Sequence, residues 1–168
     1  MKRLIIFLII IGLKLSAQTN KPLEEWNNEC IRVGNNRVKE IEQGIDTSQV
    51  IVKKLKSKKY DNGSLKYYKT SQGYFKIVKT YTIDKTIYTE TYYSLGQWPV
   101  YAELGPGKPA LADRLYYDKS NPMVWIDKAN KTISFDNELL YRKGQEVLAA
   151  FEKLNKIAGL RDETVKEE

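Results

Sequence analysis

The sequence predicts an α+β fold: an N-terminal amphipathic helix, an antiparallel β-meander of six to eight strands and a C-terminal amphipathic helix. Apolar residues recur at helical spacing near both ends of the 168-residue chain, over residues 21–43 and 136–158, and at every second position between these segments. Short turn signals separate the runs in the middle, and strands joined by short turns pair antiparallel. We expect a single domain over residues 18–160, with both helices on one face of the sheet.

The N-terminal segment is typical of a secretory signal peptide. Two basic residues, Lys2 and Arg3, precede an uninterrupted apolar run over residues 4–13. A helix of that length extends about 15 Å, half of a hydrocarbon core of about 30 Å, so we expect no transmembrane anchor in the mature form. We expect residues 1–17 to be removed and the protein to be exported, to the periplasm or to the outside of the cell.

The helix predicted over residues 21–43 has Pro22 in its first turn and Gly44 at its end. Gly34 lies on its apolar stripe and costs about 1 kcal/mol of helix stability relative to alanine, which favours close packing at that point. We expect the stripe to be buried, and with it the single cysteine, which has no partner for an internal disulfide. The stripe consists of Leu23, Trp26, Cys30, Val38, Ile41 and Ile45.

The middle of the chain is rich in β-branched and aromatic residues, which favour strands. Strand-like runs read VIVKKLK, YFKIVKTYTI, TIYTETYY, VYAEL, RLYY, MVWID and TISF. In the second run, alternation places one set of side chains on the face covered by the helices, leaving Tyr74 half-exposed on the other face. That set consists of Phe75, Ile77, Tyr81 and Ile83.

The turn signals between these runs are specific. Residues 61–63, Asp-Asn-Gly, predict a tight hairpin turn because asparagine and glycine tolerate positive φ angles. Two Tyr-Tyr pairs, at residues 92–93 and 116–117, are expected to end strands. Pro99 and Pro122 then fall near the starts of the following strands, where a missing N–H does least harm.

The second helix is predicted to begin at a cap provided by Asp136 or Asn137 and to end at Gly159. Its stripe again contains a glycine, Gly144. The tail that follows, residues 161–168, is charged and poor in apolar groups, and we expect it to be disordered. The apolar positions of the stripe are Leu140, Val147, Leu148, Phe151, Leu154 and Ala158.

A signal peptide, a Tyr-Asp-Asn-Gly-x-Leu hairpin at residues 60–65, repeated Tyr-Tyr turns and a closing amphipathic helix occur together in this chain. In this combination the chain resembles uncharacterised secreted proteins of Gram-negative bacteria. The hairpin phrase is also distantly similar to the units of MORN-like hairpin repeats. The resemblance implies export and a hairpin-based sheet, and it implies no activity or site residues.

The composition excludes several kinds of chemistry. The chain has no histidine, which removes Ser-His-Asp and Cys-His catalysis and the usual zinc ligand, and one cysteine cannot replace it. Phosphate-binding glycine motifs are also missing from the sequence, and we expect no cofactor and no metal. A carboxylate-dependent hydrolase stays open as an alternative, since it needs only two facing acids. Candidate acids are Glu90, Glu103, Asp113, Asp118 and Asp127.

The chain has a formal net charge of +7, and nine lysines interleaved with aromatic residues lie between residues 53 and 79. Such a surface can hold an acidic ligand through charge and ring stacking. The other interpretation is a solvated sheet face with a lysine-protected edge. The candidate binding residues are Lys54, Lys56, Lys58, Tyr67, Tyr74 and Lys76.

The sequence therefore favours an exported, non-catalytic binding domain that uses an aromatic and basic sheet face. The expected ligand is an acidic glycan, another envelope component or an exported protein, and export argues against nucleic acid. Another hypothesis is an inhibitor or accessory subunit of an exported protein, with the GPGKPALA segment at residues 105–112 as its binding loop. The oligomeric state does not follow from the sequence.

Overall fold

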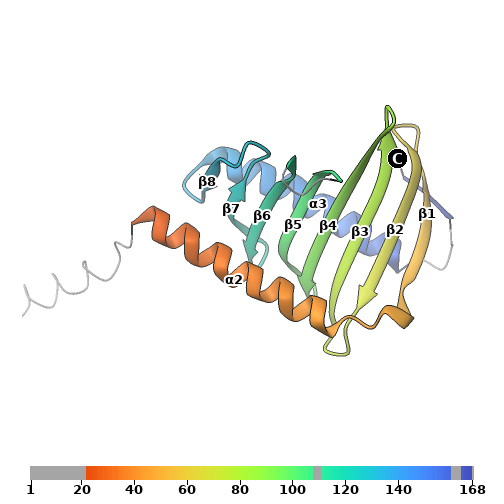
Figure 1. Ribbon diagram of the computed structural model, residues 1–168, viewed down its shortest axis with the longest axis horizontal. Coiled ribbons are helices and arrows are strands. Elements are labelled where there is room, and N and C mark those ends of the chain that lie inside the picture. The colour runs from red at the N-terminus through yellow and green to blue at the C-terminus, as the bar shows by residue number, and fades with distance from the viewer. Residues whose placement is uncertain (1–21, 108–110, 160–163, 168) are drawn as a thin grey trace, which may run out of the picture.

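The computed structural model describes residues 22–107, 111–159 and 164–167 (Figure 1). The expected signal peptide and residues 108–110 of the GPGKPALA segment lie outside these ranges. Two long helices, α2 (Leu23–Gly44) and α3 (Glu138–Ala158), occupy the segments with helical periodicity, and a short 3-10 turn, η1 (Thr47–Gln49), follows α2. The side chain of Asn137 caps α3 by accepting a hydrogen bond from the N–H of Leu139. Among the described residues, no helix is long and apolar enough to cross a membrane.

One mixed sheet forms the centre of the fold, and the α+β class is confirmed. Its order is β8-β7-β6-β5-β4-β3-β2-β1-β9, so eight consecutive strands form an antiparallel meander and β9 pairs parallel with β1. The nine strands exceed the six to eight that the sequence predicts. They are β1 (Ile51–Lys56), β2 (Asp61–Lys69), β3 (Tyr74–Ile83), β4 (Thr86–Leu95), β5 (Trp98–Pro106), β6 (Asp113–Asp118), β7 (Asn121–Ile126), β8 (Thr132–Ser134) and β9 (Thr164–Lys166).

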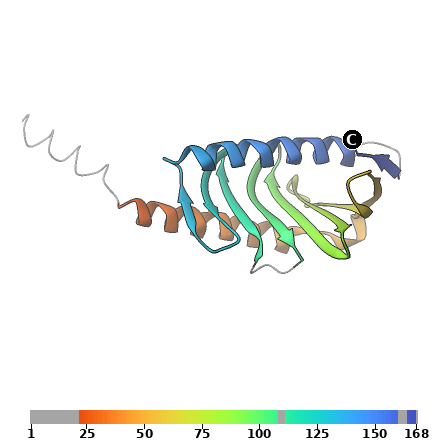
Figure 2. The same cartoon turned by 90° about the horizontal axis from the view of Figure 1, so that it is seen from above.

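The two helices lie on opposite faces of the sheet, as Figure 2 shows, and the expectation that they share one face was wrong. Successive strand residues point to opposite faces. Tyr92 packs on Phe151 of α3, whereas its neighbour Tyr93 packs in the cluster that contains Ile41 of α2. A tyrosine ring can be buried once its hydroxyl has a partner. The hydroxyl of Tyr93 donates to Glu42, so the second face is buried as well.

Each face has its own apolar cluster. The α3 face buries the inward side chains of β1 to β6 against α3, and Phe75 and Ile77 lie there as predicted. The α2 face buries a smaller cluster between α2 and β4 to β7. Residues buried on the α3 face include Leu65, Phe75, Ile77, Tyr92, Leu115, Phe151 and Leu154. Those on the α2 face are Ile41, Tyr93, Val100, Tyr101, Tyr116 and Val124.

Both helices approach the sheet most closely at a glycine. A Cβ atom on Gly34 of α2 would lie 2.5 Å from Cδ1 of Tyr116, and one on Gly144 of α3 would overlap the ring of Pro122. Tyr116 and Pro122 belong to neighbouring strands, β6 and β7. The close approach that Gly34 suggests from the sequence is confirmed, and Gly144 has the same function on the other face.

The Asp-Asn-Gly segment is not a hairpin turn. Residues 57–60 make the connection from β1 to β2, and Asp61 already belongs to β2. The register between β2 and β3 shifts between Asp61 and Ser64, and Asn62 has a φ of 49° within this irregularity. Asparagine's tolerance of positive φ is therefore used in a bulge of the strand.

The ends of the chain also differ from expectation. Trp26 is 44% exposed and Cys30 is half-buried, although the sequence predicts both in the core. The fully buried positions of α2 are Asn27, Gly34 and Ile41, seven residues apart, so Trp26 and Cys30 lie at the side of the buried line. The sequence predicts a disordered tail, but residues 164–166 form β9. The N–H of the next residue, Glu167, donates to the carbonyl of Lys56.

Candidate binding groove beside helix α2

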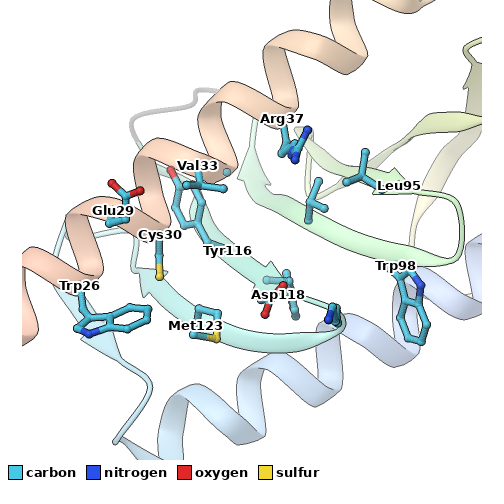
Figure 3. A pocket seen from close by; sticks show the side chains of 14 residues that line it. Trp26, Glu29, Cys30, Val33, Arg37, Leu95, Trp98, Tyr116, Asp118 and Met123 are labelled. Atoms are coloured by element: carbon cyan, nitrogen blue, oxygen red, sulfur yellow. The ribbon is translucent and has the colours of Figure 1, made fainter. Parts of the chain in front are cut away.

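A half-open groove of about 650 Å³ lies between α2 and the ends of β4 to β7 (Figure 3). We call it the α2 groove. Helix α2 provides one wall, and the turns between β4 and β5 and between β6 and β7 provide the opposite side. Its apolar lining consists of Trp26, Cys30, Val33, Gly34, Leu95, Trp98, Val100, Tyr116, Tyr117 and Met123. Such concave, mainly apolar surfaces with a few polar groups are typical of binding sites.

Two tryptophans lie at the two ends of this groove. Trp26 comes from the first turns of α2, and Trp98 is the first residue of β5 (Figure 3). Their side chains are 44% and 46% exposed, respectively. A large aromatic side chain that is half-exposed lacks part of the stabilisation that full burial of its apolar surface would give. Both indoles therefore present surface to an occupant of the groove.

The floor of the groove belongs to the α2-face core. Tyr116 is 3% exposed, its ring lies against Gly34, and its hydroxyl donates to Asn35 of α2 at 3.2 Å. Val100 from the neighbouring strand is also buried. The floor is therefore packed on the side that faces away from the groove.

The rim of the groove carries charges of both signs. Glu29 and Arg37 lie on α2, Asp118 is the last residue of β6, and Lys119 lies in the turn after it. The guanidinium of Arg32 binds Glu29 at 2.6 Å, and that of Arg37 binds Glu40 at 2.7 Å, so α2 pairs its own rim charges along its surface. A mixed rim around an apolar centre is the usual arrangement of a protein–protein contact surface.

Cys30 is the nucleophilic side chain in this groove. Burial raises the pKa of its thiol, and the nearby negative charges of Glu29 and Asp118 raise that pKa further. A reactive cysteine requires the opposite environment, in which positive charge lowers the pKa. At neutral pH Cys30 is therefore a protonated, apolar lining residue.

The structure does not bring the six predicted binding residues together on one face. Lys54 and Lys56 point to the α2 face of β1, beyond the reach of α2, while Tyr67 points to the α3 face and stacks on Phe75 at 5.1 Å. Lys58 lies in the connection between β1 and β2. Tyr67 lies on the α3 face because it pairs with Ile77 in the register between β2 and β3, whereas its neighbour Lys66 points to the other face and is exposed.

The other two predicted residues lie under the C-terminal half of α2. Tyr74 packs against the α2-face cluster. The ammonium of Lys76 binds Glu42 at 2.6 Å and lies 5.7 Å and 5.2 Å from the ring centres of Tyr68 and Tyr93. Lys76 is therefore engaged in holding α2 to the sheet.

The candidate acids of the hydrolase alternative do not share a site. Glu103 lies on the α2 face and accepts from the hydroxyl of Tyr101 at 2.8 Å. Glu90 and Asp113 lie on the α3 face, but Leu104 of β5 stands between them in the register. Asp118 is on the rim of the α2 groove, and Asp127 accepts two backbone N–H groups in the turn before β8. Their positions offer no facing pair to this chemistry.

Sequence reasoning missed the α2 groove. The signal was present in Trp26 and Trp98, two of only three tryptophans in the chain, but helical periodicity assigned Trp26 to the core. The third, Trp125, is anchored through its indole N–H, which donates to Asp113 at 2.9 Å. The difference between an anchored and a half-exposed tryptophan is visible only in the folded chain.

In comparisons with known proteins, the chain matches no protein-family model, no curated protein and no solved structure.

Proposed function

We propose that the protein is an exported, non-catalytic binding domain and that its α2 groove receives an apolar segment of a protein partner. The observation that carries this proposal is the pair of half-exposed tryptophans at the ends of a preformed apolar groove. Export rests on the apolar N-terminal segment of the sequence.

The chemistry of the groove favours a protein segment over a glycan. Its lining presents the aliphatic groups of Val100 and Leu95 and the thioether of Met123, and of these only the sulfur, a weak acceptor, can hydrogen-bond to a sugar hydroxyl. Apolar side chains of a partner would displace water from this floor and pack between Trp26 and Trp98. Tryptophan, tyrosine and arginine are the residue types that most often dominate binding energy at such contacts, and Arg37 on the rim completes the set.

In the experiment, wild-type and variant proteins are immobilised, and the partners that each retains from the exported fraction of the host are compared. The double variant W26A/W98A should lose a partner that the wild type retains, because both anchors are removed from the groove. Y141A is the matched control, since Tyr141 is 61% exposed on α3 and lies outside the groove. A partner retained equally by all three proteins would overturn the assignment to the α2 groove.

Binding of an isolated apolar peptide from that partner should also quench or shift the fluorescence of Trp26 and Trp98. Replacing its apolar anchors with serine should abolish the change. A partner segment that binds equally well after this replacement would contradict an apolar mode of recognition.

A further inference from the structure

A second constellation lies on the opposite face of the sheet, at the end formed by β1 and β9. The carboxylate of Glu167 accepts a hydrogen bond from the hydroxyl of Tyr60 and one from the ammonium of Lys79, the latter at 2.9 Å. Both charged side chains are largely buried, with 9% of Lys79 and 12% of Glu167 exposed. We call Tyr60, Lys79 and the ring of Tyr81 the carboxylate cradle.

The cradle is organised by the sheet rather than by the tail that fills it. The ammonium of Lys79 lies 5.0 Å from the ring centres of both Tyr60 and Tyr81, and 4.0 Å from Glu90 of β4. The rings of Tyr60 and Tyr81 pack on each other at 4.9 Å. Tyr60 lies in the connection directly before β2, Lys79 and Tyr81 lie in β3, and Glu90 lies in β4. Besides Glu167, the ammonium therefore has three partners that belong to the sheet and its connections, the two rings and Glu90.

Of the tail, residues 164–167 are described, and their backbone contacts are those of one short strand. Strand β9 pairs with β1 at three positions, and it is parallel to β1 although all other neighbours in the sheet are antiparallel. Thr164 and Lys166 are exposed, and Val165 is half-buried. Glu167, which directly follows β9, thus provides the one buried charged contact of residues 164–167. A short edge strand of this kind can exchange with another strand that offers the same hydrogen bonds.

Space and charge at this end of the sheet exceed what Glu167 uses. A cavity of about 340 Å³ lies beside the cradle, bordered by Lys59 and Lys153. A second, of about 600 Å³, lies along the connection after β1 and is bordered by Lys56, Lys58 and Lys166. With Lys79, six lysines line the two cavities, and Glu167 is the single acid lining them. Five of these lysines lie outside the tail, since Lys166 belongs to β9 itself. This field favours an acidic occupant.

We propose that the β1 edge and the carboxylate cradle form a binding site for an extended acidic segment of a partner protein, which replaces the chain's own β9. A peptide fits better than an acidic glycan because the edge of β1 offers a row of backbone hydrogen bonds, as the bond from the N–H of Glu167 to the carbonyl of Lys56 shows. In this arrangement the chain's own tail is an internal competitor for the site. The site is separate from the α2 groove and lies on the other face.

The test uses full-length protein and a fluorescent peptide with the sequence of residues 161–168, RDETVKEE. This peptide contains the β9 residues that pair with β1 and the glutamate whose carboxylate binds in the cradle. In the variant E167A the cradle is vacated while the rest of the chain is kept. The labelled peptide should bind E167A saturably and about tenfold or more tightly than it binds the wild type, whose own tail competes. E24A, which removes an exposed glutamate from α2, should bind as the wild type does.

Recognition of the carboxylate is tested on the peptide, where no folding defect can intervene. A peptide with glutamine at the position of Glu167 should bind E167A about tenfold more weakly. Adding Y60F to E167A, which removes one hydroxyl from the cradle, should weaken the acidic peptide more than the glutamine peptide, because an amide oxygen accepts that hydrogen bond less strongly than a carboxylate does. The double variant W26A/W98A should leave both affinities as they are, which separates this site from the proposed function.

Three results would overturn the proposal. One is the lack of saturable binding to E167A at millimolar peptide while circular dichroism shows an intact fold. Another is equal affinity for the acidic and the glutamine peptide, which would mean that the cradle does not read the carboxylate. The third is complete displacement of the peptide by polygalacturonate at the same carboxylate concentration, which would mark the site as a general polyanion surface.

Discussion

The ring of Tyr116 lies directly against Gly34, where a Cβ atom would lie 2.5 Å from Cδ1 of that ring. Tyr116 is 3% exposed and also forms the floor of the α2 groove, so the ring has little room to move away. The glycine therefore sets the distance between α2 and the sheet, and through it the width of the groove.

Replacing Gly34 with alanine should lower the stability of the protein. Helix propensity alone would gain up to about 1 kcal/mol, but overpacking against a buried ring costs about 1 to 3 kcal/mol, so we expect a net loss. Denaturant unfolding of G34A measures it. N36A, at an exposed position two residues further along α2, should be neutral or slightly stabilising. A G34A protein as stable as N36A would show that α2 can move away from β6.

The two kinds of aromatic residue should respond differently to truncation. Phe151 is 2% exposed and stacks on Phe75 at 5.9 Å, so F151A should cost about 3 to 5 kcal/mol of unfolding free energy. Trp26 and Trp98 lie half in water, and alanine at either position should cost less than about 1 kcal/mol. Thermal or denaturant unfolding of the three single variants decides this. A large loss in W26A would place Trp26 in the core after all.

The thiol of Cys30 should react slowly at neutral pH. Because burial and the charges of Glu29 and Asp118 raise its pKa, the reactive thiolate is scarce until the pH rises well above that of an ordinary cysteine. The labelling rate with a disulfide reagent should therefore increase at a higher pH than for a free cysteine under the same conditions. E29Q should move this rise toward lower pH. A labelling rate at pH 7 equal to that of free cysteine would contradict the environment described for Cys30.

Acid should weaken the protein partly through Glu167. Burial raises the pKa of its carboxyl, but hydrogen bonds from Tyr60 and Lys79 and the charge of Lys79 outweigh burial and lower the pKa. A folded-state pKa below the unfolded value of about 4.3 contributes stability that is present above that value and is lost as the pH falls through the folded pKa. Between pH 5 and pH 3, the stability of E167Q should therefore fall less steeply than that of the wild type. Equal slopes would mean that the pair with Lys79 is not formed in solution.

Export predicts a shortened chain. Protein recovered from its native host should have an intact mass that lacks residues 1–17, because the apolar segment is expected to be cleaved after Ala17. A variant with arginine at Leu8 and Ile10 should interrupt the apolar run and stop processing, so that the full-length mass appears inside the cell. A wild-type protein that retains its first 17 residues would contradict export by cleavage.

Local sequence determined the elements of this fold. The change from a period of 3.6 to a period of two and back marks α2, the meander and α3, because each period reflects which side chains one element buries. Pro99 and Pro122 mark the second positions of β5 and β7, and Gly34 marks the closest approach of α2 to the sheet. These features depend on residues within one element or one turn.

The tertiary structure alone decided how these elements use their faces. Alternation in a strand identifies two sides but does not say which helix covers either side. A tyrosine can lie on a buried or an exposed side, depending on whether its hydroxyl finds a partner, as that of Tyr93 does in Glu42. The exposure of Trp26 likewise depends on how α2 is rotated above β5 to β7. The pair of Glu167 and Lys79 joins residues 88 positions apart. Such a contact has no local period, because only the assembled sheet, in which β9 pairs with β1, brings the carboxylate of Glu167 to the ammonium of Lys79 on β3.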